Sequence, residues 1–161
     1  MLELQSVHSD VVGCYANPAS LDRLSPNGGR IVRVAPNELL LLGERGRLPE
    51  LEAELAGRDP SSVVLDLSSA FSIWSLRGEE RYEAFCRLSH IELPDPPGVA
   101  QGLVAHVPGK VIVLEDELLV LVSSAVAHHL RERLRAACVD LDPVQTVART
   151  QERPAEQATP A

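Results

Sequence analysis

Aromatic side chains are scarce in this sequence. Trp74, Tyr15, Tyr82, Phe71 and Phe85 make up 3% of its 161 residues. Proteins that bind single-stranded nucleic acids stack the bases on such rings, and this chain offers almost none. Positive charge is also in deficit, because 15 Lys and Arg stand against 23 Asp and Glu, for a formal net charge of −8. Such a chain repels a polyanion on average, so nucleic acid is not an expected partner.

Cysteines are few, and their spacing fits no cysteine-based site. Cys14, Cys86 and Cys138 are odd in number and form no CxxC pair, which argues against a disulfide framework and against a zinc knuckle. We expect them to be buried free thiols. No apolar run reaches the roughly 18 residues of a membrane span, and no basic segment followed by an apolar one opens the sequence. These absences predict a cytoplasmic chain that does not contact a membrane.

Signatures of common catalytic sites are missing as well. The sequence has no HExxH, GxSxG, GxGxxG or GxxxxGK motif. His128 and His129 are adjacent, and neighbouring residues of a helix point about 100° apart, so the pair is poorly placed to clamp one metal ion. We therefore nominate no catalytic residue and no metal ligand. Asp66 lies in an apolar stretch where burial would raise its pKa; the favoured alternative is that it faces solvent or caps the turn at Ser68 and Ser69.

What the sequence does contain is typical of a globular chain, with 45% hydrophobic and 24% charged residues. The length suits a single domain. Turn-forming residues crowd the beginning, and apolar residues thin out at the end. We therefore expect an irregular N-terminal segment over residues 1–29, one domain over residues 30–142 and a disordered C-terminal tail over residues 143–161.

Short apolar runs bounded by turn formers predict strands between these limits. The runs cover residues 31–35, 39–42, 63–67, 71–76, 101–107, 111–114 and 118–122. We expect the first four to pair as two hairpins, and the last three to form a meander whose first turn contains Pro108 and Gly109. The first and last turns of this pattern also reveal a repeat, because VAPNELLLL (Val34–Leu42) is echoed by VLEDELLVL (Val113–Leu121). The repeat predicts two related α+β halves.

Helical spacing of apolar residues predicts three helices. The first passes through Leu48, Leu51 and Leu55 and stops at Gly57, and the second follows Gly78 and buries Tyr82, Phe85 and Cys86. The third starts at Ser123 or Ser124 and buries Val126, Leu130, Leu134 and Cys138. Its outer side carries Arg131, Arg133 and Arg135, which fit either a solvated face or a subunit interface.

Three stretches occur in the order of a known family. Arg33–Gly43 (RVAPNELLLLG), Ser62–Leu88 and Pro96–Leu134 resemble the gamma subunit of heterotetrameric sarcosine oxidase, a member of the aminomethyltransferase-like family that includes the glycine cleavage system T-protein. The resemblance implies an α+β fold of interleaved ferredoxin-like units, with antiparallel sheets and helices packed on one face.

The same resemblance implies a function in sarcosine catabolism and one-carbon metabolism. The chain would be a non-catalytic small subunit that supports assembly of an enzyme oxidising N-methyl amino acids. Its partners would be larger flavoprotein subunits, and these, rather than this chain, would hold FAD or FMN, NAD and tetrahydrofolate.

An alternative is a stand-alone tetrahydrofolate-binding module. Folate-binding relatives contact the pterin with an acidic residue and with an Asn at the start of the last helix, where this chain has Ser123. Ser123 is thus the one candidate cofactor contact, and its identity favours the non-catalytic subunit. A free-standing enzyme is the weakest alternative, because no base can be paired with a nucleophile.

Overall fold

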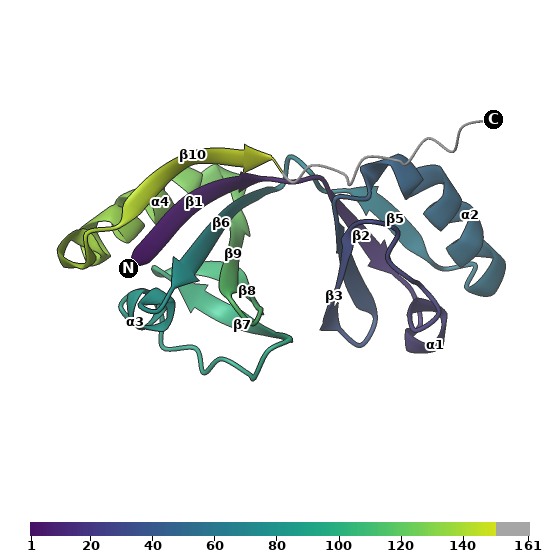
Figure 1. The fold of residues 1–161 in the computed structure, drawn as a ribbon. Coiled ribbons are helices and arrows are strands. Elements are labelled where there is room, and N and C mark those ends of the chain that lie inside the picture. The colour runs from purple at the N-terminus through teal and green to yellow at the C-terminus, as the bar shows by residue number, and fades with distance from the viewer. Residues whose placement is uncertain (151–161) are drawn as a thin grey trace, which may run out of the picture. The chain divides into compact units, whose positions relative to one another are not determined.

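Two compact units make up the described chain (Figure 1). The structure is a computed structural model, and it describes residues 1–150. Unit 1 contains Met1–His8 and Ser69–Arg149, and unit 2 contains Ser9–Ser68. Unit 2 is thus inserted in the sequence between two strands of unit 1. The expected single domain over residues 30–142 is wrong, because its N-terminal limit falls inside unit 2 and it leaves out the first strand of unit 1.

Unit 1 is built on a six-stranded sheet with the order β10-β1-β6-β9-β8-β7. Its strands are β1 (Leu2–His8), β6 (Phe71–Gly78), β7 (Gly98–Val104), β8 (Val107–Val113), β9 (Glu117–Ser123) and β10 (Val144–Thr150). Its helices are α3 (Arg81–Cys86) and α4 (Ala127–Ala137), with short 3-10 turns η2 (Ser124–Val126) and η3 (Val139–Leu141). The pairs from β1 through β7 are antiparallel, and Figure 1 shows β1 in purple beside β6 in teal.

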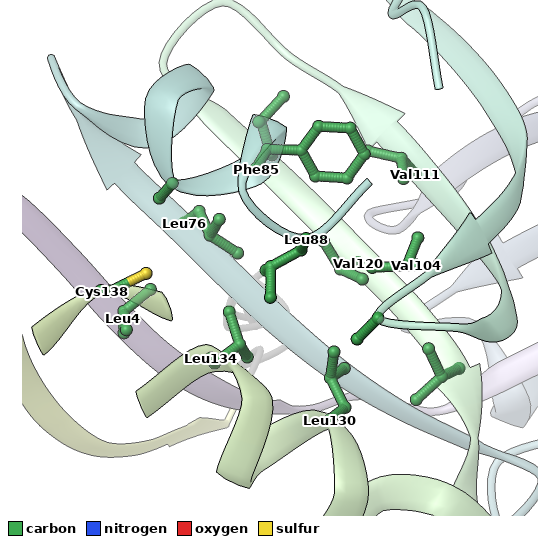
Figure 2. Close-up of a cluster of buried hydrophobic side chains, with 14 of the residues drawn as sticks. Leu4, Leu76, Phe85, Leu88, Val104, Val111, Val120, Leu130, Leu134 and Cys138 are labelled. Atoms are coloured by element: carbon green, nitrogen blue, oxygen red, sulfur yellow. The ribbon is translucent and has the colours of Figure 1, made fainter. Parts of the chain in front are cut away.

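The core of unit 1 lies between this sheet and its helices, as Figure 2 shows. Leu130 and Leu134 of α4 are buried there with Phe85 of α3. The sheet contributes Leu4, Leu76, Val111 and Val120, among others. Fully burying a side chain of this size stabilises the fold by roughly 1.5–3 kcal/mol. On β9 the intervening Leu119 and Leu121 are buried too, which explains its unbroken apolar sequence.

Unit 2 has a four-stranded antiparallel sheet with the order β3-β4-β2-β5. Its elements are β2 (Val11–Tyr15), α1 (Pro18–Leu21), β3 (Arg30–Ala35), β4 (Glu38–Leu42), η1 (Arg45–Arg47), α2 (Leu48–Arg58) and β5 (Val63–Asp66). Leu51 and Leu55 of α2 pack on the sheet beside Val12, Cys14 and Leu41. The chain order βαββαβ with these neighbours is the ferredoxin-like arrangement.

Unit 1 repeats this arrangement, except that one strand position in its sheet is filled by a different segment of the chain. Strands β8, β9 and β6 lie side by side as β3, β4 and β2 do, but the next position, held by β5 in unit 2, is held in unit 1 by β1 from the start of the chain. The repeated sequences fall on β3–β4 and β8–β9, at equivalent places in the two units. The α+β class, the antiparallel sheets and the two related halves are therefore confirmed.

The N-terminal expectation was wrong. Residues 1–29 contain β1, β2 and α1, and side chains such as Leu2, Val11 and Cys14 are completely buried. Leu2 and Leu4 alternate with polar residues, which is a strand pattern. We gave more weight to the turn-forming residues at 17–29 and so missed this strand. At the other end, β10 replaces the first part of the expected tail, and residues 151–161 lie outside the described part of the chain.

Two predicted turns also differ from the structure. The strands at 63–67 and 71–76 form, but not as a hairpin, since β5 pairs with β2 and β6 with β1 and β9. The boundary between the units falls between them, at Ser68 and Ser69. The meander forms as expected, but its first turn is Ala105–His106, while Pro108 and Gly109 lie inside β8.

The helices follow the predicted pattern with local exceptions. Helix α2 continues through Gly57 to Arg58, and its C-cap is Asp59, whose N–H donates to the Leu55 carbonyl. In α3, Phe85 is buried, whereas Tyr82 and Cys86 are exposed. Of the helices within residues 1–150, none combines the length and the apolar character that crossing a membrane requires.

Candidate functional site

Ser123 is the last residue of β9 and the N-cap of η2. Its Oγ accepts a hydrogen bond from the Ala125 N–H at 3.3 Å, as serine commonly does at the start of a helical segment. The next residue fixes this point to the start of β6, because the Ser124 N–H donates to the Ala70 carbonyl at 2.9 Å and the Ser124 Oγ donates to the Ser69 carbonyl at 2.8 Å. The predicted cap at Ser123 is confirmed for the 3-10 turn η2, whereas α4 itself begins at Ala127, with Val126 as its N-cap.

A hollow of about 420 Å³ opens beside Ser123, and we call it the Ser123 hollow. It is lined by Phe71, Gln101, Gly102, Leu103, Pro108, Gly109, Lys110, Leu121, Val122 and Ser123. Phe71 pairs with Ser123 across the strands, and Lys110 pairs with both Leu121 and Gln101. Because side chains alternate along a strand, Ser123 and Leu121 project from the face opposite to the one that Val120 and Val122 turn towards the helices. The hollow therefore lies on the sheet face away from α3 and α4.

The lining of the Ser123 hollow is mostly apolar, with one charged side chain. Its lining includes no carboxylate and no imidazole. The charged group is Lys110, whose Nζ donates to the Gln101 Oε1 at 3.2 Å, and Leu103 leaves 59% of its surface exposed at the rim. An exposed leucine beside a single ammonium can hold an apolar group that carries a negative charge, but the lining offers no base and nucleophile pair.

The two adjacent histidines separate as their helical positions require. The Nε2 of His129 lies 2.7 Å from the Ala105 carbonyl oxygen, whereas the Nδ1 of His128 lies 2.7 Å from an Arg131 nitrogen. Within residues 1–150 the structure brings together no three His, Cys, Asp or Glu side chains that could hold a metal ion. Each histidine instead has a local partner.

Asp66 caps the turn that follows β5. Its Oδ1 accepts from the Ser68 Oγ at 2.6 Å and from the Ser68 N–H at 3.1 Å, and its Oδ2 lies 2.9 Å from the Arg45 Nε. The hydrogen bonds from Ser68, with a smaller effect of Arg45, lower the pKa of the carboxyl group below its ordinary value. The favoured interpretation of this residue is confirmed, and the raised pKa is excluded.

The glutamates of the repeat make equivalent cross-strand bonds. Glu38 opens β4 and accepts from the Tyr15 hydroxyl at 3.4 Å. Glu117 opens β9 and accepts from Arg77 at 3.1 Å, and also from the Ser75 hydroxyl at 2.5 Å. Glu38 joins β4 to β2, and Glu117 joins β9 to β6, the equivalent strands of unit 1. The repeat therefore extends from the backbone to these side chains.

Sequence reasoning missed a buried carboxylate in unit 2. Glu44 is 3% exposed. Its Oε1 accepts from the Asn27 N–H at 2.5 Å and the Gly29 N–H at 3.2 Å, while its Oε2 pairs with Arg47 at 2.5 Å. Arg47 in turn donates to the Ser25 carbonyl at 2.9 Å. The pair holds the Gly-rich loop against η1, and no local pattern around Glu44 indicates it.

Comparisons with known proteins give a fold rather than a family. The sequence matches no protein-family model and no curated protein. One chain of the heterotetrameric sarcosine oxidase from Corynebacterium sp. U-96, in complex with pyrrole 2-carboxylate, superposes with a TM-score of 0.73 at 17% identity, covering 90% of this chain and 87% of that one.

Aminomethyltransferase T of the glycine cleavage system from Bartonella henselae superposes with a TM-score of 0.60 at 13% identity. The match covers 90% of this chain and 47% of the transferase, so the chain spans about half of that protein's length. At these identities the likeness is one of fold. The chain shares its fold with a chain of a sarcosine oxidase and with part of an aminomethyltransferase.

Proposed function

We propose that this chain is the non-catalytic small (gamma) subunit of a sarcosine-oxidase-like flavoprotein complex, of the aminomethyltransferase-like family. The observation that carries the proposal is the extent of the fold match, which covers nearly the whole length both of this chain and of a chain from a heterotetrameric sarcosine oxidase. The second match covers only half of its protein. A match over nearly the full length of both chains supports a subunit role more directly than a match to part of a longer enzyme does.

The Ser123 hollow supports a role in assembly rather than catalysis. Its lining contains no carboxylate. The residue at the position where folate-binding relatives contact the pterin is Ser123, and its hydroxyl caps the η2 turn. In this proposal the larger subunits hold FAD or FMN, NAD and tetrahydrofolate and oxidise the N-methyl amino acid. This chain contributes binding surface, and the exposed Leu103 beside Lys110 is suited to an apolar contact with an acidic neighbour.

Affinity capture from native lysate tests the subunit proposal. The tagged chain is expected to recover a larger protein whose absorption spectrum is that of a flavin. A chain that purifies alone, with no flavoprotein recovered from its own cell extract, would contradict the proposal.

Two surface variants test whether the Ser123 hollow contacts the captured flavoprotein. Leu103→Asp charges the Ser123 hollow, and Val63→Asp charges β5 of unit 2, where the valine is 47% exposed. Both replaced side chains are exposed, so both variants are expected to fold. If the hollow contacts the partner, only Leu103→Asp loses the flavoprotein; if both variants retain it, the contact lies elsewhere on the chain.

The size of the same hollow favours a second candidate, a stand-alone tetrahydrofolate-binding module. A volume of about 420 Å³ falls in the range of small-molecule sites, and Lys110 could pair with a carboxylate of the ligand. Calorimetric titration with tetrahydrofolate tests this candidate, with Lys110→Ala expected to weaken binding and Glu52→Ala on the exposed side of α2 as the matched control. No heat at ligand concentrations well above micromolar would exclude it.

A further inference from the structure

The turn between β7 and β8 has an unusual backbone. Ala105 and His106 have φ angles of 51° and 71°, in the left-handed region that side chains with a Cβ seldom adopt. Two-residue turns of this geometry ordinarily contain Asn and Gly. Such a conformation persists only where its surroundings hold it, and it is common at functional sites.

Two neighbours hold this turn in place. The Ala105 N–H donates to the Leu88 carbonyl at 2.7 Å, and the Ala105 carbonyl lies 2.7 Å from the Nε2 of His129 on α4. Because a carbonyl oxygen only accepts, the His129 Nε2 carries the proton of this bond. His129 is therefore a positioning residue for the turn, and its constrained geometry presents the neighbouring His106 at the surface.

His106 borders a second hollow, of about 430 Å³, which we call the His106 hollow. Its polar lining is Cys86, Arg87, Ser89, His90, His106 and Arg133. These residues come from α3, the segment after it, the turn and α4. Four of the six carry nitrogen donors, and the lining contains no Asp or Glu.

The two arginines of the His106 hollow differ in their partners. Arg87 is neutralised by Glu83 at 2.7 Å and by Asp140 at 2.5 Å. Arg133 is different: among the arginines of unit 1 whose side chains are described, it alone has neither an ion pair nor a hydrogen bond. The others are Arg77, Arg81, Arg87, Arg131 and Arg135. The hollow therefore contains one uncompensated guanidinium group beside two imidazoles.

We propose that the His106 hollow binds the oxyanion of a small molecule, with Arg133 as its charged anchor and His90 and His106 as hydrogen-bond donors. A guanidinium group presents paired N–H groups that match a carboxylate or a phosphate. The net charge of −8 does not oppose this, because charges more than about 8 Å away are largely screened at physiological salt. The proposal does not rest on the proposed subunit role, since Arg133, His90 and His106 line only the His106 hollow, whereas Leu103 lines both hollows.

Cys86 provides a reporter inside the hollow. Its thiol is exposed, whereas Cys14 and Cys138 are buried; burial raises the pKa of Cys14 to about 11 and raises that of Cys138. A neutral maleimide is therefore expected to label Cys86 alone in the folded protein. The labelling rate is measured in the full chain against inorganic phosphate and, separately, against acetate, with ionic strength held constant by sodium chloride.

The expected result is a saturable, several-fold slowing by at least one of the anions, with half of the effect at roughly millimolar concentration. Arg133→Gln should abolish the protection, and Arg135→Gln on the same helix, outside the hollow, should preserve it. His106→Asn gives a second test, since Asn tolerates the left-handed backbone but lacks the imidazole, and it should weaken the protection. Slowing by phosphate alone or by acetate alone identifies the oxyanion.

Either of two results would overturn the proposal. One is a labelling rate that neither anion changes, and the other is equal protection in the Arg133→Gln and unmodified chains. Circular dichroism of each variant checks that the fold is retained, so that a loss of protection reports on the hollow itself.

Discussion

Replacing Leu130 with alanine is expected to destabilise unit 1 strongly. Leu130 lies on α4, is completely buried and belongs to the core cluster of Figure 2. The substitution removes three carbon atoms, for a transfer loss of about 2.4 kcal/mol at about 0.8 kcal/mol each. The cavity left behind brings typical losses for such changes to about 2.7–5 kcal/mol.

Urea unfolding followed by tryptophan fluorescence measures this loss. Trp74 is the only tryptophan of the sequence, and it packs against the same cluster from β6, so its emission reports on the unit that is perturbed. With a denaturant slope of about 2 kcal/mol per M, a loss of about 3 kcal/mol lowers the urea midpoint by about 1.5 M.

The control is Leu103→Ala, which truncates the same side chain where it is 59% exposed. Exposed substitutions of this kind change stability by about 0.5 kcal/mol or less. If the two variants shift the midpoint equally, or if Leu130→Ala costs under about 1 kcal/mol, the packing assigned to α4 is incorrect.

Three further predictions concern the Glu44–Arg47 ion pair, the loss of stability at acid pH and the reactivity of the cysteine thiols. Glu44→Gln leaves the guanidinium group of Arg47 without its buried partner and should cost about 3–5 kcal/mol in thermal denaturation, whereas Glu50→Gln, at a side chain that is 62% exposed, should cost little. Asp59 accepts hydrogen bonds from the hydroxyl and N–H of the serine two residues on, and these bonds lower its pKa in the folded state. The carboxylate therefore stabilises the fold at pH values above its unfolded pKa of about 3.9, and this stabilisation is lost as pH falls through the folded pKa. Asp59→Asn should consequently flatten the decline of stability below about pH 4. Mass spectrometry after neutral maleimide treatment should find one adduct, at Cys86, in the folded chain and three in urea, and three adducts without urea would show that the other two thiols are accessible.

Sequence periodicity predicted most elements correctly where the local signal was strong. The β3–β4 and β8–β9 pairs combine apolar runs with short polar turns, and α2 and α4 have leucines at helical spacing, so each signal lies within a few residues. Strand β2 was missed because its sequence, VVGCY, is short and contains a glycine. In the turn at Ala105–His106, tertiary bonds stabilise residues that turn statistics disfavour, and Pro108 and Gly109 drew the prediction to the wrong place.

The pairing of distant segments is where prediction from sequence ended. The sequence near Ser68 resembles a hairpin loop, and only the register of β5 with β2 and of β6 with β1 shows that the chain passes there from one unit to the other. The Ser123 hollow shows the same limit. Ser123 was named from its place before the last helix, but Phe71, Leu103 and Lys110 join it through strand pairing across four neighbouring strands, β6, β9, β8 and β7.

The insertion of unit 2 between β1 and β6 also has a consequence for the order of folding during synthesis. Strand β1 is made first, yet its partner β6 begins at Phe71. At translation rates of about 5–20 residues per second, the two are separated by roughly 3–12 s. All four strands of unit 2 are made in that interval. The nascent chain can therefore complete the inserted sheet while the apolar side of β1, with Leu2 and Leu4, is still exposed, and that side stays open to wrong partners until β6 is made.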